Sequence, residues 1–409
     1  AFWLSKQESL SSVLRPETER EQVTGPNTGN RSSRRKTRSD VSRTKHVATT
    51  TGRPWLAATA LGVSGFVALV YEVAWTRILA LIIGPTTYAF SAMLTAFIGG
   101  LALGSALGTR LAKRSQSKIL ALGITLVFAA LGALAVSWLV GYLPLQVAHT
   151  VAAPDAQFSR VMIYQTAVVM VLFLPMTTAL GAAFPLAVSV ATQPERSISA
   201  DVATVYVINT FGSIAGALTA SFLLVPKFGL QNTISGASLI AIGMGITLFL
   251  ISRETHKRTR YISWIASTTA IAVAASAPTW NNELLSSGAY KYAPYIRQAD
   301  LEAGLSAGRL LYYKEGAAGT VSVRQVAGTT ALAIDGKVDA TNAGDMLTQS
   351  LLAHLPLMLH PKPEEVAIIG LGSGVTLGAS LTHPVSQVDM LEISPQVVEA
   401  SAFFNSENH

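Results

Sequence analysis

The sequence predicts a polytopic α-helical membrane domain, followed by a small antiparallel β-sheet and the start of an α/β domain with parallel strands. Half of the 409 residues are hydrophobic and only 13% are charged, whereas soluble globular proteins carry about 25% charged residues. Long apolar stretches recur until residue 277, and short β-prone runs and a glycine-rich bend follow. A wholly soluble enzyme is therefore disfavoured, and the apolar content excludes an intrinsically disordered chain.

Cysteine content and charge narrow the chemistry further. The chain contains no cysteine, which excludes disulfides, thiol nucleophiles, iron–sulfur clusters and cysteine-bound zinc. The net charge of +7 is unevenly distributed, since residues 278–409 contain seven basic and thirteen acidic side chains. We therefore expect no nucleic-acid partner for that region.

Residues 1–54 are polar and basic, and they lack apolar periodicity. Such a composition predicts a disordered N-terminal tail. The tail either fixes the membrane topology alone or also contacts anionic lipid headgroups, at about 1 kcal/mol for each basic residue. Because the first residue is Ala1 and the last lies within an unfinished domain, we expect the chain to be a fragment at both ends.

Residues 55–277 predict a transmembrane helical domain with six or seven spans. A spanning helix needs about 20 apolar residues, and small residues at four-residue spacing let such helices approach closely. The seventh stretch is rich in Ser, Thr and Ala, so it either crosses the membrane or lies at its interface. The seven apolar stretches are 55–83, 88–109, 119–143, 162–190, 204–226, 233–251 and 261–277.

Basic residues are concentrated in alternate loops of this domain. Four lie between the second and third stretches and four follow the sixth, whereas the intervening loops contain only Arg160 and Lys227. Cytoplasmic loops carry the excess of Lys and Arg in membrane proteins. The N-terminus is therefore expected in the cytoplasm. Six spans would place residues 278–409 there too, and seven would place them outside.

Residues 278–343 predict a small β-domain. Three β-prone runs are separated by glycine-containing turns, which favours an antiparallel sheet. These runs are 310–314, 320–325 and 330–334.

Residues 344–409 are interpreted as the N-terminal part of a Rossmann-like domain. Residues 344–359 have helical periodicity, with leucines on one side. The apolar runs 366–369 and 387–393 resemble buried parallel strands, and a helical stretch lies between them. This order predicts one βαβ unit.

Three glycines follow the first of these strands at the turn into the helix: Gly370, Gly372 and Gly374. Without Cβ atoms, the backbone can approach a ligand closely. Glu392 ends the second strand, 18 residues after Gly374, where a carboxylate can accept hydrogen bonds from both ribose hydroxyls of an adenosine. The pattern predicts a nucleoside-cofactor site. Its Gly-x-Gly-x-Gly spacing differs from that of dinucleotide sites, so an adenosyl sulfonium fits better than NAD.

These motifs resemble the polyamine aminopropyltransferases, or spermidine synthases. Besides the glycine motif, the runs that carry the resemblance are 334–341, 344–349 and 352–360. The membrane half resembles the fused transporter-like/spermidine-synthase proteins of bacteria, in the runs 64–77 and 206–216. The resemblance covers roughly residues 55–409 and implies an S-adenosylmethionine-dependent transferase domain.

The resemblance implies transfer of an aminopropyl group from decarboxylated S-adenosylmethionine to an amine such as putrescine. It implies a substrate-binding role for Asp345. The family's catalytic Asp would lie beyond His409, so no catalytic residue is assigned and we expect the fragment alone to be inactive. The cofactor-binding residues that it implies are Gln349, Gly370, Gly372, Ser373, Gly374 and Glu392.

Three positions depart from the family pattern. Asp339 replaces a Gln, Thr348 replaces a Tyr, and Ser373 replaces the Asp that binds the aminopropyl ammonium. Loss of that carboxylate removes a charge-assisted hydrogen bond worth roughly 1.5–3 kcal/mol. The donor is therefore either decarboxylated or ordinary S-adenosylmethionine.

The first hypothesis is a membrane-bound, spermidine-synthase-like transferase. The alternative is a polyamine or small-molecule transporter or sensor with a regulatory or degenerate α/β domain, in which the intramembrane Glu72 and Arg77 act in transport. The expected partners are the lipid bilayer and a small amine, and a homodimer is left open. A bacterial inner membrane is expected, with the C-terminal domain in the cytoplasm, where adenosyl donors are made.

The histidines predict no metal site. His354 and His360 lie six residues apart and lack the i, i+4 spacing of helical metal ligands. We expect His354 to be a structural residue.

Overall fold

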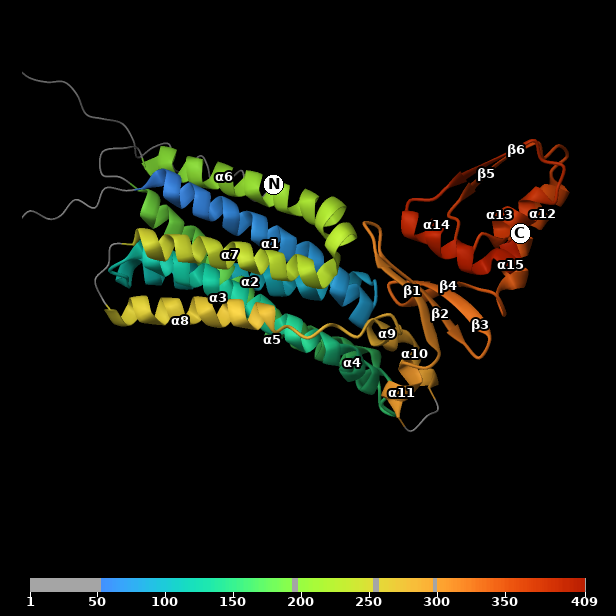
Figure 1. The fold of residues 1–409 in the computed structure, drawn as a ribbon, viewed down its shortest axis with the longest axis horizontal. Helices are drawn as coiled ribbons and strands as arrows, with labels where there is room; N and C mark the ends of the chain where they lie inside the picture. Colours follow the sequence, from blue (N-terminus) through green and yellow to red (C-terminus); the bar gives the residue numbers. More distant parts are fainter. Residues whose placement is uncertain (1–52, 193–197, 253–256, 297–299, 409) are drawn as a thin grey trace, which may run out of the picture. The chain divides into compact units, whose positions relative to one another are not determined.

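The computed structural model of the protein describes residues 53–192, 198–252, 257–296 and 300–408. These residues belong to one compact unit, Thr51–His409. The predicted tail, residues 1–54, lies almost wholly outside the described residues, so its disorder stays a prediction. Figure 1 shows the described elements in chain order, from the blue α1 to the red C-terminal helices.

The N-terminal region consists of long apolar helices, as the sequence predicts. Among the described residues, five helical stretches have the length and composition to cross a membrane. The predicted third stretch is divided, because α3 ends at Leu139 and two short helices follow it. The elements are α1 (Pro54–Ile83), α2 (Thr87–Arg114), α3 (Lys118–Leu139), η1 (Val140–Tyr142), α4 (Leu143–Val151), α5 (Phe158–Ala191), α6 (Ile198–Thr219), η2 (Ala220–Leu224), α7 (Val225–Ile251) and α8 (Lys257–Ala275).

The longest apolar stretch, Ser199–Ile251, contains two helices. Gly229 interrupts it with φ 79° and ψ 170°, a conformation that glycine adopts readily because it lacks Cβ. After this reversal α7 runs back along α3, since Ser252 Oγ lies 3.1 Å from Ser117 Oγ. The stretch therefore supplies two passes through the bundle, as the separate predictions 204–226 and 233–251 require.

Helix α8 packs along the other helices instead of lying apart from them. Trp138 Nε1 of α3 donates a hydrogen bond to Val273 O of α8 at 3.3 Å, and Ala270 is fully buried in the main apolar core. Gln231 Nε2 of α7 donates to Pro278 O, just beyond α8, at 2.6 Å. These contacts hold the second half of α8 against the bundle, and Figure 1 shows α8 alongside the other helices. Helix α8 is not among the five stretches that are long and apolar enough to cross a membrane.

Small residues bring the helices into backbone contact. Gly104 of α2 faces the carbonyl of Thr178 and the amide of Ala182 on α5, and Gly212 of α6 faces Gly62 of α1. Where lipid surrounds a bundle, such close packing is a main source of helix association. The small residues at four-residue spacing therefore form the α2–α5 and α1–α6 contacts.

Gly104→Leu should destabilise the α2–α5 contact, because the new side chain would meet rigid backbone of α5. We expect a loss of about 1–3 kcal/mol, seen as a lower unfolding temperature in detergent. Gly99→Leu is the matched control on the same helix, since a Cβ at Gly99 meets nothing within 4 Å. Equal unfolding temperatures for the two variants would contradict this packing.

A four-stranded antiparallel sheet follows, in the order β1-β2-β3-β4. The three predicted strands are present, and β4 was missed because its sequence is mostly polar. The signal for it was Asp335-Gly336, a two-residue hairpin turn in which both residues have positive φ. The elements are α9 (Asn282–Leu285), α10 (Ala289–Tyr292), η3 (Ala293–Tyr295), α11 (Leu301–Leu305), β1 (Arg309–Glu315), β2 (Thr320–Val326), β3 (Thr329–Ile334) and β4 (Lys337–Thr341).

Glu315, the last residue of β1, joins the sheet to the bundle. Its carboxylate accepts hydrogen bonds from the Leu230 amide of α7 and from the Tyr313 hydroxyl. Gly229 leaves the room that this carboxylate occupies, because a Cβ there would lie 2.7 Å from Glu315 Oε2. Burial raises the pKa of the Glu315 carboxyl above its ordinary value, and the two hydrogen bonds offset part of that effect.

Stability should depend on pH through this group. A carboxyl whose pKa is raised in the folded state stabilises the fold most below the ordinary value of 4.5, and it loses that contribution as pH rises through the folded pKa. The unfolding temperature should therefore fall as pH rises above the ordinary value of 4.5, and it should fall less in Glu315→Gln. The same pH dependence of the unfolding temperature in the wild type and in Glu315→Gln would contradict a contribution from Glu315.

The chain ends in an α/β region whose two strands are parallel. Ile369 lies opposite Leu391, and the helix between the strands completes the predicted βαβ unit. Helices α14 and η4 pack on the first sheet, where Phe404 is fully buried. The elements are α12 (Met346–Leu359), β5 (Glu365–Ile369), α13 (Val375–Leu381), β6 (Gln387–Leu391), α14 (Pro395–Ser401), η4 (Ala402–Phe404) and α15 (Asn405–Asn408).

Candidate functional site

The glycine bend follows β5 directly. Gly370, Gly372 and Gly374 have φ values of 90°, 56° and 85°, which L-residues rarely adopt. A Cβ at Gly370 or Gly372 would meet nothing within 4 Å, whereas one at Gly374 would lie 2.8 Å from Asn408 Nδ2. The first two glycines therefore leave backbone open to a ligand, and the third allows α15 to pack against the bend.

Glu392 lies beside this bend. Because β5 and β6 are parallel and in register, their carboxyl ends meet at one edge of the sheet. Glu392 Oε2 accepts the Leu371 amide at 2.8 Å, and its Oε1 accepts the Ser394 amide at 2.9 Å. Strand β6 ends at Leu391, two residues before the predicted strand end. A carboxylate offers about four lone-pair positions, so acceptor capacity remains for a ribose diol.

Gln349 and Ser373 are bonded to each other. The Ser373 hydroxyl donates to Gln349 Oε1, and Gln349 Nε2 donates to Thr341 O at 2.8 Å. Ser373 is only 1% exposed, and its Oγ also accepts the Val375 amide at 3.3 Å. Its hydroxyl is thus turned into the protein and is not available to a cofactor.

Asp345 lies at the start of α12, where its carboxylate accepts hydrogen bonds from the amide and the hydroxyl of Thr341. Thr341 therefore connects Asp345 with Gln349, and through Gln349 with Ser373. Sequence reasoning assigned no role to Thr341. It also missed Asn408, whose Nδ2 donates to Ser373 O at 2.7 Å and which no sequence pattern singled out.

Residues 345–407 match the family model described as the spermine/spermidine synthase domain. We call this segment the synthase-like region. It contains the predicted site residues from Asp345 to Glu392, and it coincides with the α/β region of the structure. The family match agrees with the resemblance that the sequence motifs carry in this part of the chain.

Three relatives show the extent of the likeness. The chain is 38% identical over 74 residues to a spermidine synthase of Dictyostelium discoideum, which is 18% of this chain and 26% of the relative. It is 39% identical over 71 residues to a polyamine aminopropyltransferase of Caldicellulosiruptor saccharolyticus, 17% of this chain and 26% of the relative. It is 41% identical over 69 residues to a polyamine aminopropyltransferase of Leptospira biflexa, which is 17% of this chain and 25% of the relative. The chain thus spans about a quarter of the length of the curated relatives it matches.

Two of the departures from the family pattern are exposed. Asp339 pairs with Lys337 at 2.6 Å at the surface of β4, and Thr348 is exposed on α12. Neither contacts the glycine bend in the described structure. With Ser373 turned inward, the synthase-like region offers no carboxylate on the glycine bend itself.

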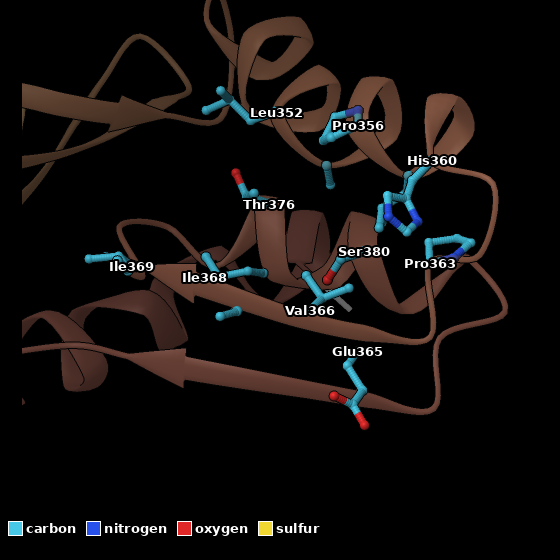
Figure 2. Close-up of a pocket in the computed structure, with 14 residues that line it drawn as sticks. Leu352, Pro356, His360, Pro363, Glu365, Val366, Ile368, Ile369, Thr376 and Ser380 are labelled. Atoms are coloured by element: carbon cyan, nitrogen blue, oxygen red, sulfur yellow. The ribbon is translucent and has the colours of Figure 1, made fainter.

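A hollow of about 500 Å³ lies between α12, β5 and α13 (Figure 2). Its lining is mainly apolar, with Leu352, Val366 and Ile368 among the residues that Figure 2 labels. Of the predicted site residues it includes only Gly370. We assign the candidate site to the bend, because Glu392 and the open glycine backbone meet there.

Two histidines lie next to each other in the synthase-like region. His354 Nδ1 is 2.8 Å from His383 Nε2, so His354 has the structural partner that its position on α12 predicts. Within the described ranges, no group of three or more metal-ligating side chains comes together.

Gln349→Ala should loosen the glycine bend, because it leaves the buried Ser373 hydroxyl without its acceptor. The lost hydrogen bond corresponds to about 1–2 kcal/mol, so amide exchange in residues 370–376 should accelerate about 5- to 30-fold. Ser350→Ala is the control on the same helix, since no side-chain hydrogen bond of Ser350 is found among the described residues. Similar exchange in both variants would show that Gln349 does not hold the bend.

Proposed function

We propose that the protein is a membrane-bound transferase of the spermidine-synthase type. It moves an aminopropyl or related group from an S-adenosylmethionine-type donor to an amine such as putrescine. The observation that carries this proposal is the position of Glu392 at an open glycine bend, within a region that matches the synthase family model. Both the geometry and the family match concern the same residues.

The chemistry assigns separate tasks to the donor and the protein. The amine nitrogen attacks the carbon bonded to the sulfonium, a C–N bond forms, and the C–S bond breaks with its electron pair on sulfur. The open backbone of Gly370 and Gly372 borders the adenosine, and Glu392 binds its ribose. No catalytic base is assigned, and the proton of the new ammonium leaves to a base or to water.

The donor is either decarboxylated or ordinary S-adenosylmethionine. The family match supports the decarboxylated form. Ser373, which is buried and uncharged, stands where the family pattern has a carboxylate that would bind a cationic aminopropyl chain. The proposal therefore includes both donors, and their relative affinities decide between them.

The membrane anchor is the second part of the proposal. Besides the five apolar stretches, large apolar side chains are exposed along the bundle, among them Ile163, Val171 and Phe222, each more than 70% exposed. A bilayer would cover them, since soluble proteins rarely leave such surfaces open. We propose a bacterial inner membrane with the N-terminus in the cytoplasm. A small amine is the proposed substrate, and no nucleic-acid partner is included.

The transporter or sensor alternative has less support. The comparisons concern an enzyme family, and Glu72 forms no ion pair with Arg77 within the described part of the chain. Burial raises the pKa of the Asp335 carboxyl in the β-sheet, and the Thr320 amide and the positive charge of Arg77 offset part of that rise.

Calorimetry on the purified full chain in detergent tests the proposal, with methylthioadenosine, S-adenosylmethionine and its decarboxylated form as ligands. Glu392→Gln should weaken binding about 10- to 100-fold, because one charged acceptor of the ribose is lost. Asp389→Asn is the matched control, since this exposed carboxylate lies on the same strand away from the bend.

Two results would contradict the proposal. One is that folded wild-type protein binds none of the three ligands. The other is that Glu392→Gln and Asp389→Asn bind equally well, which would remove Glu392 from the site.

A further inference from the structure

The helical bundle has two ends that differ in charge and in what they contact. One end, here called the basic end, contains Arg53, the α2–α3 connection and Ser252. Its residues are joined by hydrogen bonds from Arg53 N to Val190 O at 2.9 Å and from Lys118 Nζ to Ser189 O at 3.4 Å. Together with the Ser117–Ser252 contact, these bonds bring α1, α3, α5 and α7 to the same end.

The opposite end, here called the sheet end, carries the β-sheet and its preceding helices. Trp280 Nε1 donates to Ser137 O at 2.9 Å, and Trp280 N donates to Gln231 Oε1 at 3.3 Å. Ala148 of α4 is buried together with Leu284 and Ala289. With the Glu315–Leu230 bond, these contacts attach the first sheet to this end alone.

Helix α8 connects the two ends. It begins at Lys257, shortly after Ser252 of the basic end, and near its last turn Val273 meets Trp138. Its 19 residues span about 28 Å at 1.5 Å per residue. The apolar part of α8 is Trp264–Ala275, which is shorter than the five stretches that are long and apolar enough to cross a membrane. Seven helical segments pass along the bundle: α1, α2, α3, α5, α6, α7 and α8. An odd number places α1's first residue and the β-sheet at opposite ends.

The distribution of basic residues indicates which end of the bundle faces the cytoplasm. The α2–α3 connection at the basic end contains Arg110, Lys113, Arg114 and Lys118. The sequence between Ser252 and Tyr261 contains four more basic residues. The connections at the sheet end contain few, chiefly Arg160 and Lys227, and Arg160 is paired with Asp155. An excess of Lys and Arg in short loops marks the cytoplasmic side.

We infer that the β-sheet and the synthase-like region, with the glycine bend and Glu392, lie on the non-cytoplasmic side of the membrane. The inference rests on the membrane-spanning part of the proposed function. It reverses the sequence-based expectation of a cytoplasmic C-terminal domain, which depended on where adenosyl donors are made. The inference takes α8 as the seventh pass, because α8 packs against α3 and α7.

The inference places the reaction after a transport step. A sulfonium nucleoside carries a permanent positive charge, and moving an unpaired charge into apolar surroundings is costly. A donor made in the cytoplasm would therefore reach the site only after export across the membrane by a carrier. The product thioether nucleoside would be released on the same outer side.

The absence of cysteine from the chain makes a direct test available. Gln116→Cys places a thiol at the basic end and Ser386→Cys places one in the synthase-like region, and both native side chains belong to exposed residues. Each full-length variant is treated with a membrane-impermeant maleimide in intact spheroplasts, and again after the spheroplasts are permeabilised. The spheroplasts count as intact when their cytoplasmic thiol proteins stay unlabelled. We expect Ser386→Cys to label fully in intact spheroplasts, and Gln116→Cys to label only after permeabilisation.

Labelling of both variants on one side would overturn the inference, because it requires an even number of passes. Labelling of Gln116→Cys alone in intact spheroplasts would overturn it too, because the orientation would be reversed. Carbonate extraction of the membranes distinguishes failure of the sidedness inference from failure of the proposed membrane anchor. A chain that leaves the membrane on extraction contradicts the membrane anchor itself, whereas a retained chain with the wrong labelling contradicts only the sidedness.

Discussion

The parallel pairing of β5 with β6 is the constraint on which the candidate site depends. It brings the end of β6 to the bend that follows β5, so that one carboxylate accepts the amides of Leu371 and Ser394. Positive φ values at the three glycines keep the backbone of this bend close to Glu392. Without this register, Glu392 would be an ordinary surface acid, and the glycines would form a turn with no partner.

A second junction couples the site to the helices. The Glu315 carboxylate at the end of β1 lies against Gly229 and accepts the Leu230 amide, so β1 is bonded to α7 at its kink. The same sheet packs against α14 and η4, and Tyr312 and Lys314 of β1 both bond to Glu399. The synthase-like region therefore packs on a sheet that is itself bonded to the helical bundle.

Local patterns predicted most of the fold, and tertiary contacts account for what they missed. Apolar length predicted the helices, alternation predicted three strands, and the glycine motif with an acid 18 residues later predicted that Glu392 meets the bend. Strand β4 is polar and was missed despite its Asp-Gly turn. The roles of Thr341 and Asn408, and the inward turn of Ser373, depend on partners distant in sequence. The packing of α8 likewise depends on a distant partner, Trp138 of α3.

The most direct measurement is an experimental structure of the full chain with methylthioadenosine bound. The account predicts that both ribose hydroxyls lie within hydrogen-bond distance of the Glu392 carboxylate, beside the open backbone of Gly370 and Gly372. A nucleoside bound in the apolar hollow between α12 and β5, with Glu392 out of reach, would contradict it.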